Sequence, residues 1–213
     1  VAFLGAQAAG RVCPINYMLS SDHVAELLHH AEAKVLVVLG PDPEIDIWNK
    51  VAEIRERAGT LEHVVAVGAT GGEDTVDFAE LLARQPASLT FPLSIDKGET
   101  AAFFHTGGTT GLPKLVRHTH ENEVHVSWFA GMFYDIGPGD VVLNGFPLFH
   151  VAGAFVLAGS AFAAGAAILI PSKLGMRSKP FVRDYWQVVE RYRVTLLSGG
   201  PTFVSTLVGR PVE

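Results

Sequence analysis

The chain has 213 residues, of which 48% are hydrophobic and 18% charged, a balance typical of a globular rather than a disordered protein. Its 16 basic and 22 acidic side chains give a formal net charge of −6, which argues against a sequence-independent nucleic-acid binder, because such proteins need a basic face. The single cysteine, Cys13, cannot form an internal disulfide, so a reducing, cytoplasmic compartment is expected.

The two ends of the sequence indicate a piece of a longer protein. Val1 stands where an initiator methionine would be, and residues 1–9 resemble the apolar end of a helix already under way. Glu213 follows Gly209-Arg210-Pro211 without a terminal signal. We therefore expect residues 1–213 to be an incomplete N-terminal domain, with further segments downstream.

The first part of the chain alternates between extended and helical patterns. Continuous apolar runs predict strands over residues 11–15, 34–39 and 63–67. Apolar residues at helical spacing predict a helix capped by Ser20, a second one ended by Gly59 and a third over residues 76–83. This order predicts an α/β fold with layered, largely parallel sheets covered by helices.

Residues 85–98 contain two prolines and few apolar periods, and they are the best candidate for a boundary between two lobes. Beyond them, apolar runs predict strands over residues 100–105, 115–118, 141–143 and 194–197. Helical spacing predicts helices over residues 121–132 and 181–192 and a last one that begins at Pro201. On the first of these we expect one stripe that contains Val124, Ser127, Trp128, Gly131 and Met132.

Residues 151–170 carry no charge and are long enough to span a bilayer. Three glycines interrupt the segment, however, and its strongest apolar run is confined to residues 167–170. A buried helix followed by a buried strand explains this pattern better than a membrane span.

One nine-residue stretch has an unusual concentration of groups that bind anions. It consists of Thr106, Gly107, Gly108, Thr109, Thr110, Gly111, Leu112, Pro113 and Lys114. Glycines let several backbone amides point toward one ligand, the hydroxyls add donors, and the lysine adds a positive charge. The stretch therefore predicts a cradle for a polyphosphate.

The same stretch does not fit the two common phosphate-binding loops. Pro113 separates the last glycine from Lys114, and the next residues look extended, whereas a Walker loop leads straight into a helix. Gly107 and Gly108 are adjacent, which excludes the dinucleotide G-x-G-x-x-G pattern. The alternative without a ligand is a flexible surface loop or hairpin tip.

Residues 106–114 resemble the phosphate-loop signature of the adenylate-forming enzymes, Thr-Ser-Gly-Thr-Thr-Gly-x-Pro-Lys, with Gly107 in place of the serine. This family contains acyl-CoA synthetases, peptide-synthetase adenylation domains and luciferases. Residues 6–16 are similar to its Ala-Gly-x-x-x-x-Pro-Leu-Asn segment, and residues 146–153 resemble the Pro-Leu-Phe-His-x-x-Gly segment of acyl-CoA synthetases. Residues 194–207 match a region in which the family has Val-Pro-Thr before a pocket helix.

The resemblance implies an ATP-dependent ligase. Such enzymes bind MgATP and a carboxylic acid, here expected to be a fatty acid, and form an acyl-adenylate and pyrophosphate. CoA then displaces AMP to give acyl-CoA. ATP, Mg²⁺ and CoA are thus the implied cofactors and co-substrates, no nucleic acid partner is implied, and a homodimer is compatible with the family.

The resemblance also assigns roles to individual residues. Residues 106–111 and Lys114 would hold the ATP phosphates, and His150 would orient the substrate carboxylate or gate its pocket. The remaining pocket residues would be Phe149, Gly153, Gly200, Pro201 and Thr202. The alternative for His150 is a core histidine bonded to a backbone carbonyl. No metal site within the chain is expected.

Two rivals to the CoA ligase remain open at this point. One is an adenylating enzyme that transfers the acyl group to a carrier-protein thiol, and the other is a non-catalytic nucleotide-binding module. The family's Tyr-Gly-x-Thr-Glu segment, its ribose-binding Asp and its C-terminal lysine do not occur in residues 1–213. We therefore expect the chain by itself not to turn over.

Overall fold

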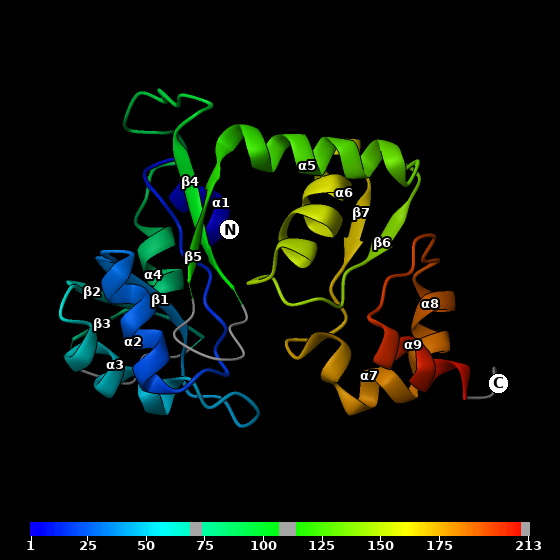
Figure 1. Cartoon of the computed structure of the whole chain (residues 1–213), viewed down its shortest axis with the longest axis horizontal. Helices are drawn as coiled ribbons and strands as arrows, with labels where there is room; N and C mark the ends of the chain where they lie inside the picture. Colours follow the sequence, from blue (N-terminus) through cyan, green and yellow to red (C-terminus); the bar gives the residue numbers. More distant parts are fainter. Residues whose placement is uncertain (69–73, 107–113, 210–213) are drawn as a thin grey trace. The chain divides into compact units, whose positions relative to one another are not determined.

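The computed structural model describes residues 1–68, 74–106 and 114–209 and divides the chain into two compact units, Val1–Thr119 and His120–Glu213 (Figure 1). The segment at residues 85–98, expected at a lobe boundary, lies inside the first unit, and its side chains are exposed. A boundary there stays a prediction.

A parallel three-stranded sheet forms one half of the first unit. Its strands, in spatial order, are β1 (Val35–Leu39), β2 (His63–Val67) and β3 (Thr75–Asp77), with Val35 opposite His63 and Val64 opposite Thr75. The helices of this unit are α1 (Ala2–Gln7), α2 (Ser21–His30), the 3₁₀ turn η1 (Trp48–Lys50), α3 (Val51–Ala58) and α4 (Phe78–Ala83). From α2 to α4 the expected order of helices and strands is confirmed, and β3 is an addition.

Local sequence signals explain the ends of α2 and α3. The Ser20 hydroxyl accepts a hydrogen bond from the His23 amide at the start of α2, and Gly59 ends α3 with a left-handed φ of 65°. Both were predicted from the sequence. Between these ends, Leu27 of α2 and Ile54 of α3 are almost completely buried where the two helices pack together.

An antiparallel hairpin forms the other half of the first unit. Strand β4 (Thr100–His105) pairs with β5 (Leu115–Thr119), as the sequence predicts. The strand expected at residues 11–15 is reduced to one parallel bridge between Val12 and Ala102. Next to this bridge, burial raises the pKa of the Cys13 thiol to about 11, so the thiol is protonated and unreactive at neutral pH.

The second unit contains a shorter parallel pair, β6 (Val141–Leu143) and β7 (Ala167–Leu169). Leu196 adds a third extended segment through a parallel bridge to Val142. The surrounding helices are α5 (His120–Phe133), the π-helix η2 (Ala152–Gly159), α6 (Ser160–Ala164), the 3₁₀ turn η3 (Gly175–Arg177), α7 (Lys179–Arg183), α8 (Tyr185–Arg191) and α9 (Pro201–Val208).

The long helix α5 packs on η2 and α6, which lie beneath it in Figure 1. The buried residues of α5 are Glu123, Ser127, Ala130 and Gly131. At the small ones the helices approach so closely that a Cβ on Gly159 would overlap the Ser127 hydroxyl. The predicted stripe is therefore buried only in part. Ser127 and Gly131 of the stripe are buried and make the contact, whereas Val124, Trp128 and Met132 are more than half exposed.

The uncharged segment at residues 151–170 folds into η2, α6 and β7. This confirms the predicted sequence of a helix followed by a strand. Within the described part of the chain, no helix combines the length and apolar character needed to cross a membrane.

Candidate functional site

The hairpin of the first unit holds the two ends of the predicted phosphate loop together. His105 lies opposite Leu115, and one step further the Thr106 amide donates a hydrogen bond to the Lys114 carbonyl over 2.9 Å. Thr106 and Lys114 are both exposed at the open end of the hairpin. The residues between them, including Gly107, Gly108, Thr109, Thr110 and Gly111, lie outside the described residues, so their role stays a prediction.

The second unit has a pocket where its extended segments end. Strand β6 leads into Gly145, β7 leads toward η3, and the segment of Leu196 leads into Gly200. In parallel α/β sheets, ligands bind outside these carboxyl ends. The pocket has a volume of about 270 Å³ and is lined by Gly145, Phe146, Pro147, Leu174, Met176, Arg177, Gly200, Pro201, Thr202 and Phe203.

Three of the residues predicted for the substrate pocket, Gly200, Pro201 and Thr202, are thus brought together in one wall. They form the start of α9, with Gly200 at the N-cap and Pro201 in the first turn. Phe203 follows and stacks on Phe181 with 6.4 Å between the ring centroids. Because Phe181 belongs to a buried cluster with Leu143, this wall rests on the core of the unit.

A further part of the pocket wall, within residues 174–177, was missed by the sequence analysis. It is held by a backbone hydrogen bond of 3.0 Å from the Met176 amide to the Gly145 carbonyl. Gly175 has a left-handed φ of 56°, and a Cβ on it would overlap the Gly145 carbonyl oxygen. A glycine at this position gives no signal in the sequence, because the contact that requires it joins segments 30 residues apart.

His150 lies in an exposed turn between the pocket and η2. Its amide donates to the Pro147 carbonyl over 3.1 Å, and its carbonyl accepts the Ala154 amide over 3.0 Å. The ring Nδ1 lies 3.1 Å from the Ala152 amide and accepts its hydrogen bond. A neutral ring must then carry its proton on Nε2, so His150 presents an N–H donor from a fixed turn. The alternative of a core histidine does not fit this exposed position.

Gly153 and Phe149 are not among the residues that line the pocket. Gly153 is buried, and a Cβ there would overlap the Pro147 carbonyl oxygen. Its own carbonyl accepts a hydrogen bond of 2.9 Å from the side-chain Nδ2 of the buried Asn144. The close packing of this turn accounts for the glycine without a ligand, and the predicted substrate contacts of Phe149 and Gly153 stay predictions.

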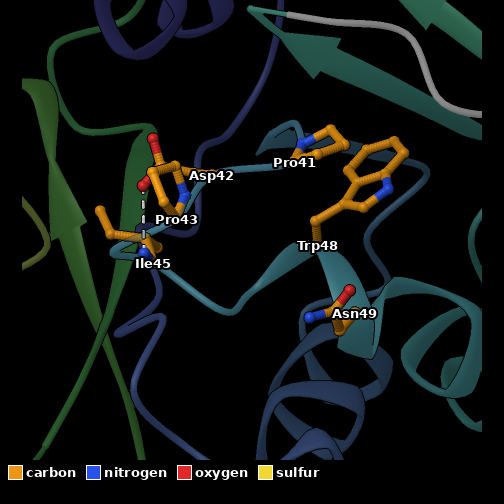
Figure 2. Close-up of a pocket in the computed structure, with 6 residues that line it drawn as sticks. All are labelled: Pro41, Asp42, Pro43, Ile45, Trp48 and Asn49. Atoms are coloured by element: carbon orange, nitrogen blue, oxygen red, sulfur yellow. Dashed lines mark hydrogen bonds between the residues drawn. The ribbon is translucent and has the colours of Figure 1, made fainter.

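A further pocket of about 320 Å³ lies in the first unit beyond the end of β1, lined by Pro41, Asp42, Pro43, Ile45, Trp48 and Asn49 (Figure 2). The Asp42 carboxylate stabilises the loop that lines this pocket, since its Oδ1 accepts hydrogen bonds from the backbone amides of Glu44 and Ile45 over 2.9 and 3.1 Å. The sequence analysis did not predict this pocket. Among the described residues, no three His, Cys, Asp or Glu side chains are grouped so that they could hold a metal ion.

Comparison with known proteins shows the family to which this chain belongs. The family model described as "AMP-binding enzyme" matches residues 1–212. The chain belongs to the AMP-binding enzyme family. This confirms the resemblance drawn from the phosphate loop and the flanking segments.

Curated relatives of this AMP-binding chain include two named CoA ligases. The marinolic acid–CoA ligase of Pseudoalteromonas sp. (strain SANK 73390) is 32% identical over 218 residues, which cover 98% of this chain and 33% of the relative. The crotonobetaine/carnitine–CoA ligase of Salmonella choleraesuis (strain SC-B67) is 28% identical over 201 residues, with 93% and 37% covered. The chain thus spans about a third of the length of these relatives.

Solved structures support the fold. The anthranilate–CoA ligase AuaEII in complex with anthranoyl-AMP superposes with a TM-score of 0.83 at 21% identity, covering 96% of this chain and 38% of that one. The Mycobacterium smegmatis MbtA structure gives a TM-score of 0.81 at 19% identity, with 97% and 37% covered. The predicted α/β fold of the AMP-binding family is therefore confirmed.

Proposed function

We propose that this chain is part of an enzyme that activates a carboxylic acid with ATP and then transfers the acyl group to CoA. The observation that carries the proposal is the family match over residues 1–212 together with the phosphate-loop signature at residues 106–114. Two relatives that are themselves named CoA ligases support the choice of CoA as acceptor. The enzyme would work in the cytoplasm, where ATP and CoA are both present.

The first step joins two anions. A carboxylate oxygen of the acid attacks the α-phosphorus of ATP, the bond to the β-phosphate oxygen breaks, and pyrophosphate leaves. Mg²⁺ would enter with ATP and neutralise part of the phosphate charge. The loop between Thr106 and Lys114 would bind the β- and γ-phosphates through amides and hydroxyls, and the Lys114 ammonium would screen the departing pyrophosphate.

The pocket of the second unit would hold the acid. Its walls are mainly apolar and include Phe146, Leu174, Met176 and Phe203, which suits a hydrocarbon tail. His150, with its donor on Nε2, would orient the carboxylate for attack. We propose an apolar, fatty-type acid as substrate on this basis.

We expect His150→Ala in the complete enzyme to raise KM for the acid about tenfold and to leave KM for ATP unchanged, because a single orienting hydrogen bond is lost. His150→Gln keeps an N–H donor at a similar distance and should recover most of the loss. His125→Ala, on the exposed side of α5, is the matched control. Steady-state exchange kinetics measure all three, and an unchanged KM for the acid in His150→Ala would contradict the role.

The proposed activity is tested by ATP–pyrophosphate exchange in the complete protein with short, medium, long and aromatic acids, followed by detection of the CoA thioester. Acid-dependent exchange without thioester formation would favour a carrier-protein acceptor. No exchange with any acid would favour a non-catalytic nucleotide-binding module. A purified 1–213 chain should show no adenylate formation, since residues outside it would complete the site.

A further inference from the structure

A short segment runs beside β4 and loses its regular pairing after one step. The Val12 amide donates to the Ala101 carbonyl over 3.0 Å, and the Val12 carbonyl accepts the Phe103 amide over 2.8 Å. In a parallel ladder, the next amide to face the strand belongs to the residue two positions on. That residue is Pro14, which has no N–H, so the ladder cannot continue.

Beyond the end of the ladder, a side chain of β4 accepts a hydrogen bond from the segment. The Asn16 amide, four residues after Val12, donates to His105 Nε2 over 3.1 Å. Because Nε2 is the acceptor, this ring must carry its proton on Nδ1 when neutral. His105 is the last residue of β4, so its ring connects the end of the segment to the end of the strand.

Both groups in this hydrogen bond are fixed on their other sides. Asn16 begins a turn in which its Oδ1 accepts the Met18 amide over 3.0 Å and its carbonyl accepts the Leu19 amide over 3.1 Å. His105 is followed directly by Thr106, whose amide closes the hairpin onto Lys114. The base of the predicted phosphate loop is therefore attached on one side to β5 and on the other, through the His105 ring, to Asn16.

We infer that His105 is a positioning residue for the ATP phosphate loop. It contacts no substrate; its ring accepts the Asn16 amide beyond the point where Pro14 ends the ladder, and it holds the residue from which the loop starts. The inference rests on the proposed function, since it takes the loop at residues 106–114 as the site of the ATP phosphates. Pro14 and Asn16 belong to the segment of residues 6–16 that resembles the family, and the inference explains physically why a proline and an asparagine stand there.

The decisive comparison uses two side chains of similar length in the complete enzyme. His105→Gln keeps a carbonyl acceptor near the position of Nε2, whereas His105→Met lacks it. We expect His105→Met to raise KM for ATP about tenfold, with kcat and KM for the acid changed less than twofold, and His105→Gln to stay within about threefold of wild type in KM for ATP. His118→Phe is the control, because His118 lies on the same hairpin with its ring against Phe104, 5.1 Å between centroids.

The outcomes separate this inference from the proposed function. Wild-type KM for ATP in His105→Met, or an equal rise in His105→Met and His105→Gln, would overturn the positioning role while acid-dependent exchange by the wild type still stood. No exchange by the wild type would overturn both. Thermal melting accompanies each assay; if His105→Met does not fold, His105→Gln decides, since near-wild-type KM supports the role and a tenfold rise overturns it.

Discussion

We expect the Lys114→Ala enzyme to exchange pyrophosphate into ATP about a hundredfold more slowly than wild type. A hydrogen bond between charged groups contributes about 1.5–3 kcal/mol, and a donor aimed at charge that develops in the transition state contributes a similar or larger amount. Lys114 meets both conditions if pyrophosphate leaves from the loop. The effect should fall on kcat as well as on KM for ATP, because charge on the leaving group increases during the reaction.

We expect Lys114→Ala to leave the fold and its stability unchanged. The part of Lys114 that the hairpin uses is its backbone carbonyl, which accepts the Thr106 amide, and its side chain is exposed. Arg117→Ala removes another exposed cation nearby, from strand β5, and should keep exchange within about twofold of wild type. A Lys114→Ala enzyme with normal exchange, or one whose melting temperature drops well below that of Arg117→Ala, would contradict the assignment.

The features that could be read from the sequence are those set by neighbouring residues. Ser20 and Gly59 predict the ends of their helices because each acts on the backbone within one turn. The hairpin around the phosphate loop was predicted because two apolar runs flank a stretch that cannot be helical. In the same way, Pro201 indicated the first turn of α9, which forms one wall of the pocket.

The features that could not be read depend on contacts between distant segments. Of the stripe predicted on α5, only Ser127 and Gly131 are buried, because η2 and α6 approach the helix closely at these two residues. The hydrogen bond from Asn16 to His105 joins residues 89 positions apart, beyond the point where Pro14 ends the ladder. The part of the pocket wall within residues 174–177 was missed for the same reason.

The largest structural effect should come from Gly175→Ala. An alanine at a φ of 56° would destabilise the folded state by about 1–2 kcal/mol, because its Cβ comes too close to its own backbone. The same Cβ would overlap the Gly145 carbonyl oxygen, a rigid backbone atom, and overpacking of this kind adds about 1–3 kcal/mol. We expect the free energy of unfolding to fall by about 3 kcal/mol in total.

A second glycine of the same unit separates the two contributions. Gly165 ends α6 with a φ of 72°, but a Cβ there would meet only Pro138 side-chain atoms at 3.8 Å or more. Gly165→Ala should therefore lower the free energy of unfolding by about 1–2 kcal/mol, the backbone contribution alone. Denaturant unfolding of both variants gives the difference, and equal losses would show that the contact between Gly175 and Gly145 does not constrain the wall.

The same pair of variants tests whether this wall belongs to the acid site. To avoid the overlap in Gly175→Ala, residues 174–177 must move away from Gly145, which displaces Leu174 and Met176 at the pocket. KM for the acid should then rise severalfold in Gly175→Ala and stay unchanged in Gly165→Ala, with KM for ATP unaffected in both. A loss of stability without any change in KM for the acid would place the substrate outside this pocket, although the close contact of the two glycines would still hold.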